Sequence, residues 1–165
     1  MKKVERVLEN TLFASRWLLA PFYIGLVTAL LELMVKFAKE LFKVFANIGS
    51  IGGNELIISV LTLVDVSLIA NLLIIITFSG YESFVSKFDV DTHEDRPGWM
   101  GKVGFGAIKV KLIGSIVAIS AIELLKVYIA LDQYNQHEIT WKVLIHITFV
   151  ISGVLFALMD KLSSK

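Results

Sequence analysis

The chain contains no cysteine among its 165 residues. This absence excludes disulfide bonds, thiolate catalysis, and cysteine-ligated zinc or iron–sulfur sites. Charge of one sign is not in excess either, because the formal net charge is +1. Such a balance favours neither a nucleic-acid-binding surface nor an acidic tail. We therefore predict no nucleic-acid partner.

Apolar residues, in contrast, are abundant: 56% of the chain is hydrophobic and the mean hydropathy is +0.74. They are concentrated in four runs, at about 17–35, 56–78, 112–131 and 141–159. A helix of about 20 apolar residues crosses a hydrocarbon core of about 30 Å. The sequence therefore predicts an all-α membrane protein with four transmembrane helices, forming a single integral membrane domain over residues 1–165.

Two further segments have apolar residues at helical spacing between charged ones. Residues 1–16 have the character of an amphipathic helix that lies at the membrane surface and leads into the first span. Residues 36–48 predict either a long helix that leaves the bilayer or an interfacial one. The long polar stretch 79–111 predicts a loop between the second and third spans.

The positions of Lys and Arg predict the orientation of the four spans. Both termini and the 79–111 loop share one side of the membrane, and they carry eleven of the 16 Lys and Arg residues. The other five are Lys36, Lys39, Lys43, Lys126 and Lys142. Because cytoplasmic segments carry the excess of positive charge, we expect both termini in the cytoplasm.

Two acids interrupt the spans near mid-membrane. Asp65 lies roughly 13 Å below the predicted outer boundary, and Glu123 roughly 16 Å above the inner one, at about 1.5 Å per residue. Acids at one depth in a low-dielectric medium can share a proton, and intramembrane acids mark functional sites by default. The alternative left open is that Glu123 pairs with Lys126 at i,i+3, while Asp65 is protonated or hydrogen-bonded to hydroxyls of other helices.

The second span has polar residues on two sides. Ser59 and Thr62 precede Asp65 at steps of three, whereas Asn71 points to nearly the opposite side of the helix. We therefore expect this span to contact protein or water on both sides, within one chain or between subunits. The alternative for the hydroxyls is a bond to carbonyls of their own helix. His146 lies about one turn inside the predicted outer boundary, where we expect it to face neighbouring polar groups. The alternative left open is a proton relay or a pH sensor.

Small residues at spacing four indicate close helix packing in lipid. The pairs are Gly25 and Ala29, Gly114 and Ala118, and Gly153 and Ala157. Because three of the four spans carry such a pair, we expect a tightly packed bundle.

No motif in the sequence indicates an enzyme, a metal site or a cofactor. The acidic stretch from Asp89 to Asp95 begins like a calcium loop, but Glu94 replaces the glycine and Met100 the final acid. The glycines at 101, 104 and 106 lack the preceding strand and the Gly-Lys of a phosphate loop. We predict no catalytic residues, no metal and no cofactor.

Several stretches resemble the YqhA-like family of small, four-span bacterial inner-membrane proteins of uncharacterised function. They are 6–10 (RVLEN), 14–21 (ASRWLLAP), 63–65 (LVD), 78–86 (FSGYESFVS), 115–120 (SIVAIS) and 145–150 (IHITFV). The resemblance implies a multi-pass protein of the bacterial cytoplasmic membrane without a known enzymatic activity, and it supplies no catalytic residues. Family members can carry histidine where this chain has Glu123, which implies an ionisable position and no strict need for a carboxylate.

Our leading hypothesis is a homo-oligomeric protein with a transporter-like or channel-like role. The predicted ion or substrate path comprises Asp65, Glu123, Thr62, Asn71 and Lys126. The alternative is a membrane scaffold or accessory subunit that binds a protein partner through its cytoplasmic surface. A predicted motif at the cytoplasmic boundary would serve that surface; it consists of Arg16, Ser79, Gly80, Tyr81 and Glu82.

Overall fold

The computed structural model describes residues 2–86 and 105–163, which form helices joined by short turns. The elements are α1 (Lys2–Ser15), the 3-10 helix η1 (Arg16–Leu19), α2 (Ala20–Ala46), α3 (Gly53–Phe84), α4 (Phe105–Ile129), the 3-10 helix η2 (Leu131–Gln133) and α5 (Gln136–Ser163). The described residues contain no strand. The all-α prediction is confirmed.

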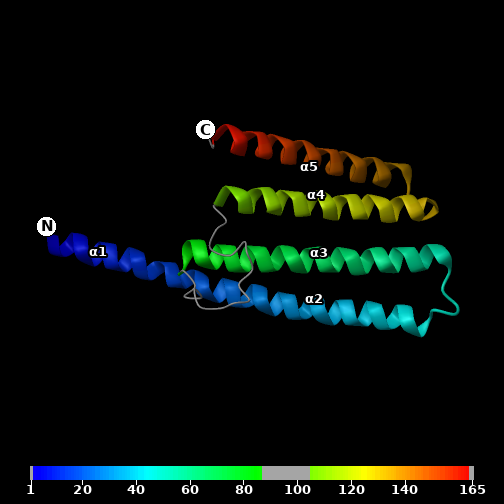
Figure 1. Ribbon diagram of the computed structural model, residues 1–165, viewed down its shortest axis with the longest axis horizontal. Coiled ribbons are helices and arrows are strands. Elements are labelled where there is room, and N and C mark those ends of the chain that lie inside the picture. The colour runs from blue at the N-terminus through cyan, green and yellow to red at the C-terminus, as the bar shows by residue number, and fades with distance from the viewer. Residues whose placement is uncertain (1, 87–104, 164–165) are drawn as a thin grey trace.

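Helices α2, α3, α4 and α5 lie side by side in chain order, each antiparallel to the next (Figure 1). The main contacts between them join α2 to α3, α3 to α4 and α4 to α5. The turns 47–52 and 130–135 lie at one end of this row, which we call the hairpin end. The N-terminal end of α2 and the C-terminal end of α5 lie at the opposite end.

Local sequence signals fix where the helices begin and end. Pro21 lies in the first turn of α2, where the missing N–H costs no helical hydrogen bond. At the start of α5, the Glu138 N–H donates to Asn135 Oδ1 at 2.8 Å, and the Asn135 N–H donates to Glu138 Oε2 at 3.3 Å. This reciprocal capping box satisfies two N–H groups that the first turn of a helix leaves unpaired.

Four helices are long and apolar enough to cross a membrane, within Leu8–Ala46, Gly53–Phe84, Lys109–Ile129 and Gln136–Leu162. They contain the predicted spans, apart from the last two residues of the third. Helices α2 and α3 also continue beyond the predicted spans, to Ala46 and Phe84. Continuing a helix keeps its backbone groups paired as the chain leaves the hydrocarbon, so the helix boundary need not coincide with the end of the apolar run.

The four helices form an open row, because α2 and α5 lie at its two edges (Figure 1). Our expectation of a tightly packed bundle was therefore wrong for the single chain. Gly25 and Gly114 have nothing within 4 Å of an added Cβ, so their small size serves no helix contact in the described part of the chain. Of the glycines in the three small-residue pairs, Gly153 alone lies against another helix, since an added Cβ would lie 3.1 Å from Ile113 Cγ2. Small residues indicate that close packing is possible, not where it occurs.

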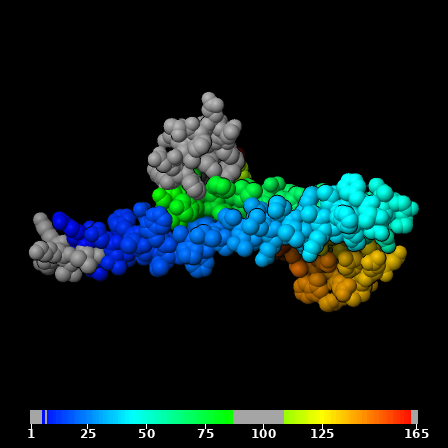
Figure 2. Space-filling view, turned by 90° about the horizontal axis from the view of Figure 1, so that it is seen from below, coloured from blue at the N-terminus to red at the C-terminus, as the bar shows by residue number. Residues whose placement is uncertain are grey.

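Helix α1 continues nearly along the line of α2 and projects beyond the row (Figure 1). Figure 2 looks onto the α2 edge and shows α2 and the coloured part of α1 exposed. Large apolar side chains are correspondingly exposed on α2 and α5, Phe22 and Val154 among them. Extended apolar surface of this kind suits contact with lipid. The position of residues 1–16 at the membrane surface stays a prediction.

Candidate functional site

The ammonium group of Lys126 on α4 lies between two carboxylates. Its Nζ atom is 2.8 Å from Oε1 of Glu123, one turn earlier on α4, and 3.1 Å from Oδ2 of Asp65 on α3. The side chains of Lys126 and Asp65 are only 13% and 15% exposed. A single partly buried cation therefore joins α3 to α4 and pairs with both predicted mid-membrane acids.

A fourth charged group, from α5, completes the cluster. Lys142 Nζ lies 3.6 Å from Oε2 of Glu123 and 5.0 Å from the ring centroid of Tyr134. The two lysines and the two acids, Asp65 and Glu123, have a net charge of zero, which lowers the cost of placing them inside a membrane protein. We call Asp65, Glu123, Lys126 and Lys142 the charge cluster.

The register of the helices explains how these residues meet. Glu123 precedes the end of α4 at Ile129 by six residues, and Lys142 follows the start of α5 at Gln136 by six. Antiparallel helices joined by a short turn bring positions at equal distances from the turn to equal depth. Lys126 lies nearer the hairpin end, but Cα–Cβ bonds tilt toward the helix N-terminus, so its side chain extends inward. There it reaches Asp65, about 18 Å along α3 from Gly53.

One oxygen of Asp65 has no hydrogen-bond partner among residues 2–86 and 105–163. Oδ1 is buried and accepts no hydrogen bond, whereas Oδ2 receives the bond from Lys126. Thr62, predicted to share the path, donates its hydroxyl to the Ile58 carbonyl at 2.9 Å. That hydroxyl therefore follows the alternative that we left open, a bond within its own helix. Burying a carboxylate oxygen without a hydrogen-bond donor costs free energy.

A second polar pair lies one turn deeper between α4 and α5. His146 Nδ1 lies 2.9 Å from Ser120 Oγ, and the Ser120 hydroxyl also donates to the Val117 carbonyl at 2.8 Å. Because a serine hydroxyl has one hydrogen, this geometry predicts the tautomer of His146 with its hydrogen on Nδ1. The prediction that His146 lies among polar groups holds in this contact.

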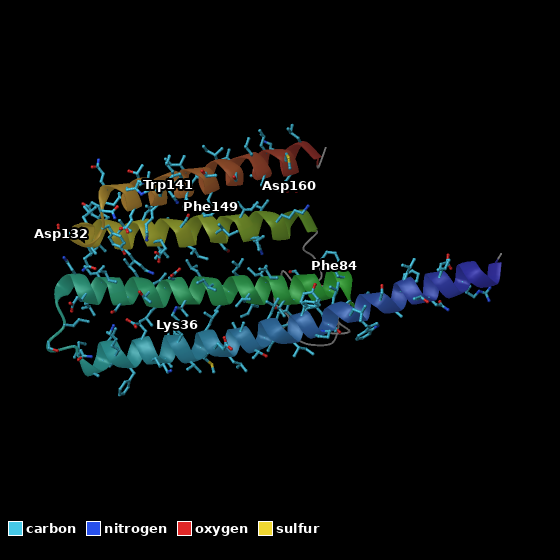
Figure 3. All side chains as sticks on the ribbon, turned by 180° about the vertical axis from the view of Figure 1, so that it is seen from behind. Lys36, Phe84, Asp132, Trp141, Phe149 and Asp160 are labelled. Carbon is cyan, nitrogen blue, oxygen red and sulfur yellow. The ribbon has the colours of Figure 1, made fainter. Side chains whose placement is uncertain are left out.

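Beyond this pair the interface of α4 and α5 becomes apolar and tight. A Cβ on Gly153 would lie 3.1 Å from Ile113 Cγ2 and 3.6 Å from Val117 Cγ2. Closer to the hairpin end, Ser120, Glu123 and Lys142 line a groove of about 310 Å³ together with apolar side chains, Phe149 among them. The sticks in Figure 3 place Phe149 nearer the middle of α5 than Trp141, which lies toward the hairpin end. Polar side chains thus extend inward from the hairpin end and stop at apolar packing.

The predicted boundary motif gathers at the opposite end of the row. Ser79 is buried, and the Tyr81 ring meets the Tyr23 ring edge to face at 6.0 Å between centroids. An added Cβ on Gly80 would lie 2.7 Å from Tyr23 Cε1, so glycine allows α2 and α3 to approach here. Glu82 is half-buried, whereas Arg16 is exposed at the start of η1.

The structure brings together three of the five predicted path residues, Asp65, Glu123 and Lys126. It places Asn71 away from them, in a groove between α2 and α3. The sequence reasoning missed Lys142 and Ser120 as members of the polar set. The equal spacing of Glu123 and Lys142 from the turn could have indicated the contact of Lys142. Using that signal requires knowing where α4 ends and where α5 begins.

The described residues contain no group of three or more His, Asp or Glu side chains arranged to hold a metal ion. The calcium-like stretch from Asp89 to Asp95 and the glycines at 101 and 104 lie outside the described residues. The charge cluster offers no vacant metal site either, because Lys126 occupies the space between its two acids.

Four long apolar helices, exposed apolar edges and a charge cluster between the helices define a multi-pass membrane protein. Residues 12–128 match the model of the uncharacterized protein family UPF0114, and the chain belongs to that family. The matched range includes Asp65, Glu123 and Lys126 and ends before Lys142. No solved structure matches the chain.

Proposed function

We propose that this protein is an oligomeric transporter-like or channel-like protein of the bacterial inner membrane that moves protons through the charge cluster. Both termini would lie in the cytoplasm, so that the hairpin end faces outward. The cluster is then entered from the outer side, along the groove lined by Ser120, Glu123 and Lys142. The four-span architecture and membership of an uncharacterised family are compatible with this role without specifying it.

The observation that carries the proposal is the unpaired Oδ1 oxygen of Asp65. A salt bridge with a purely structural role is most favourable when every buried lone pair has a donor. In the described part of the chain, one oxygen of the largely buried Asp65 carboxylate has no donor, although Lys126 holds the other at 3.1 Å. An unsatisfied buried group in a native protein calls for an explanation, and a catalytic or redox role is one of those known.

The surroundings of Asp65 favour a proton over a metal cation. A metal ion at Oδ1 would lie close to the Lys126 ammonium group, which is 3.1 Å from Oδ2, and the two cations would repel each other. A proton on Oδ1 forms a covalent O–H bond and needs no further ligands. It also removes the charge of Asp65, which releases Lys126 to Glu123 alone.

The cluster can therefore adopt two states that differ by one proton. With Asp65 ionised, Lys126 is shared between Asp65 and Glu123; with Asp65 protonated, Lys126 pairs with Glu123, which also contacts Lys142. In the structure, where Lys126 contacts both acids, Gly153 packs closely against Ile113 in the inner part of the α4 and α5 interface. A change in the pairing of Lys126 alters what holds α3 to α4, which is the kind of two-state element that couples a proton to a movement.

Flux measurements on the protein in liposomes test the proposal. We expect wild-type protein to dissipate a pH gradient, and Asp65→Asn and Glu123→Gln each to reduce the proton flux by at least tenfold. The matched control is Asp132→Asn, which changes an exposed acid of η2 at the hairpin end (Figure 3). Sodium, potassium and small organic anions are measured in parallel. No proton flux in the wild type, or flux unchanged by both cluster substitutions, would contradict the proposal.

A second candidate function, a scaffold or accessory subunit, is favoured by a specific observation. Asp65 is closed into an ion pair with Lys126, and the inner part of the α4 and α5 interface is apolar. In that role the cluster would hold α3, α4 and α5 in register, and a protein partner would bind at the cytoplasmic surface. Liposomes without flux of any ion, combined with a lower melting temperature of Asp65→Asn, would favour the scaffold.

A further inference from the structure

Asn71 lies in the middle of the membrane-spanning helix α3 and is exposed there. It follows the start of α3 by 18 residues and precedes its end by 13, which corresponds to about 27 Å and 20 Å of helix. The side chain lines a groove of about 390 Å³ between α2 and α3. Except for Ser67 and Asn71 itself, the lining is apolar, with Leu30, Met34 and Phe37 from α2.

The polar groups near this groove differ in how they are satisfied. The Ser67 hydroxyl donates to the Leu63 carbonyl at 2.9 Å, so it needs no other partner. Within the described part of the chain, the carboxamide of Asn71 makes no hydrogen bond. A primary amide exposed to hydrocarbon loses its bonds to water and gains none, which costs free energy. A partner that supplies both a donor and an acceptor at this depth would remove that cost.

A second copy of the same chain meets this requirement. Two copies inserted in the same orientation and related by a two-fold axis along the membrane normal present equal residues at equal depth. A carboxamide has two N–H donors and a carbonyl acceptor, so two Asn71 side chains can satisfy each other. A carboxylate could not do this, and a lipid tail supplies neither donor nor acceptor.

The surface around Asn71 also permits close approach. Ser67 and Ala70 are small residues on the same side of α3, and small residues let helix backbones approach in a membrane. Among the described residues, the groove is lined by α2 and α3 alone, and no further described helix covers it. The charge cluster lies on the side of α3 that faces α4, so this contact leaves the cluster free.

We propose that a second copy of this chain packs on the groove between α2 and α3, with the two Asn71 carboxamides hydrogen-bonded across the interface. The proposal deepens the oligomeric assembly included in the proposed function, because it names the surface and the polar contact. It does not depend on proton movement, and its test reads association alone. A protein without flux that still associates through Asn71 would leave this interface standing.

The lack of native cysteine allows a direct test by oxidative cross-linking in membranes. Ser67→Cys places one thiol a single turn from Asn71 on the proposed interface. The matched control, Val154→Cys, places one on α5 at a side chain that is 63% exposed. We expect covalent dimers from Ser67→Cys at low protein-to-lipid ratio and few from Val154→Cys. Equal cross-linking of the two variants would overturn the proposal.

The role of the amide is tested in the Val154→Cys background, whose exposed thiol on α5 carries the fluorescent label away from the proposed interface. Asn71→Leu should weaken association by about threefold to thirtyfold, the range for one hydrogen bond between membrane helices, whereas Asn71→Gln should retain most of it. Fluorescence energy transfer between labelled copies gives the dissociation constant, and circular dichroism confirms that each variant is folded. If Asn71→Leu fails to fold, Asn71→Ala replaces it. An unchanged dissociation constant in a folded Leu or Ala variant would overturn the contact.

Discussion

The ammonium group of Lys126 lies 3.1 Å from Oδ2 of Asp65, although the two residues are 61 positions apart in the chain. The same group lies 2.8 Å from Oε1 of Glu123 on its own helix. Asp65 and Glu123, which the sequence predicts at similar depths in the membrane, are thus connected through a cation. This arrangement makes charge balance, more than repulsion between carboxylates, the governing feature of the site.

Removing the shared cation should destabilise the protein. Lys126→Met leaves two acids without their common partner, and breaking a buried ion pair on one side costs about 3–5 kcal/mol. We expect a lower melting temperature in detergent. Adding Asp65→Asn should recover part of the loss, with a coupling free energy of about 0.5–3 kcal/mol. Strictly additive effects of the two substitutions would show that the ion pair does not form.

Gly80 gives a prediction at the other end of the row. In Gly80→Ala the new methyl group would lie 2.7 Å from Tyr23 Cε1, so the Tyr23 ring must move away from α3. We expect a loss of about 1–3 kcal/mol, the cost of overpacking, measured by thermal unfolding. Gly25→Ala on α2 is the control, because nothing lies within 4 Å of its added Cβ. That variant should be neutral or more stable, since alanine favours a helix over glycine. Equal effects of the two substitutions would contradict the close approach.

The contact of His146 with Ser120 predicts a tautomer. Because the Ser120 hydroxyl donates to the Val117 carbonyl, Nδ1 of His146 should carry a hydrogen, and the neutral ring should leave Nε2 unprotonated. Nitrogen NMR of histidine-labelled protein measures this directly, with His146→Gln to assign the signal. Ser120→Ala should shift the ring toward the commoner Nε2–H form. A wild-type His146 already in that form would contradict the assigned geometry.

The fold could be predicted from the sequence because hydrocarbon imposes a simple rule on the chain. Every backbone group within the membrane must be paired, so apolar runs of about 20 residues indicate helices. The arrangement of the helices could not be predicted in this way. Gly25 and Gly114 belong to the same kind of pair as Gly153, yet only Gly153 lies against another helix. The spacing of small residues along one helix contains no information on which side a neighbour occupies.

The candidate site was predicted in part for a related reason. Asp65 and Glu123 stand out because a charged residue in an apolar run is costly, and the matching of depths brings them together. Lys142 does not stand out, because it lies near the end of its span, where a long cationic side chain is ordinary. Its contact with Glu123 depends on a turn that ends α4 at Ile129 and begins α5 at Gln136. A shift of two residues in that turn would place Lys142 beside another residue.

The most direct test of the account is whether Asp65 takes up a proton while the protein remains folded. Infrared difference spectra, recorded on lowering the pH of wild type, Asp65→Asn and Asp132→Asn in lipid, resolve the carboxylic acid C=O band of each acid. Because no described residue donates a hydrogen bond to Oδ1 of Asp65, we predict a band at the high-frequency edge of this region. It should be absent from Asp65→Asn and present in Asp132→Asn. If Asp65 stays ionised at every pH at which the protein is folded, Lys126 holds it permanently, and the proton-moving role is contradicted.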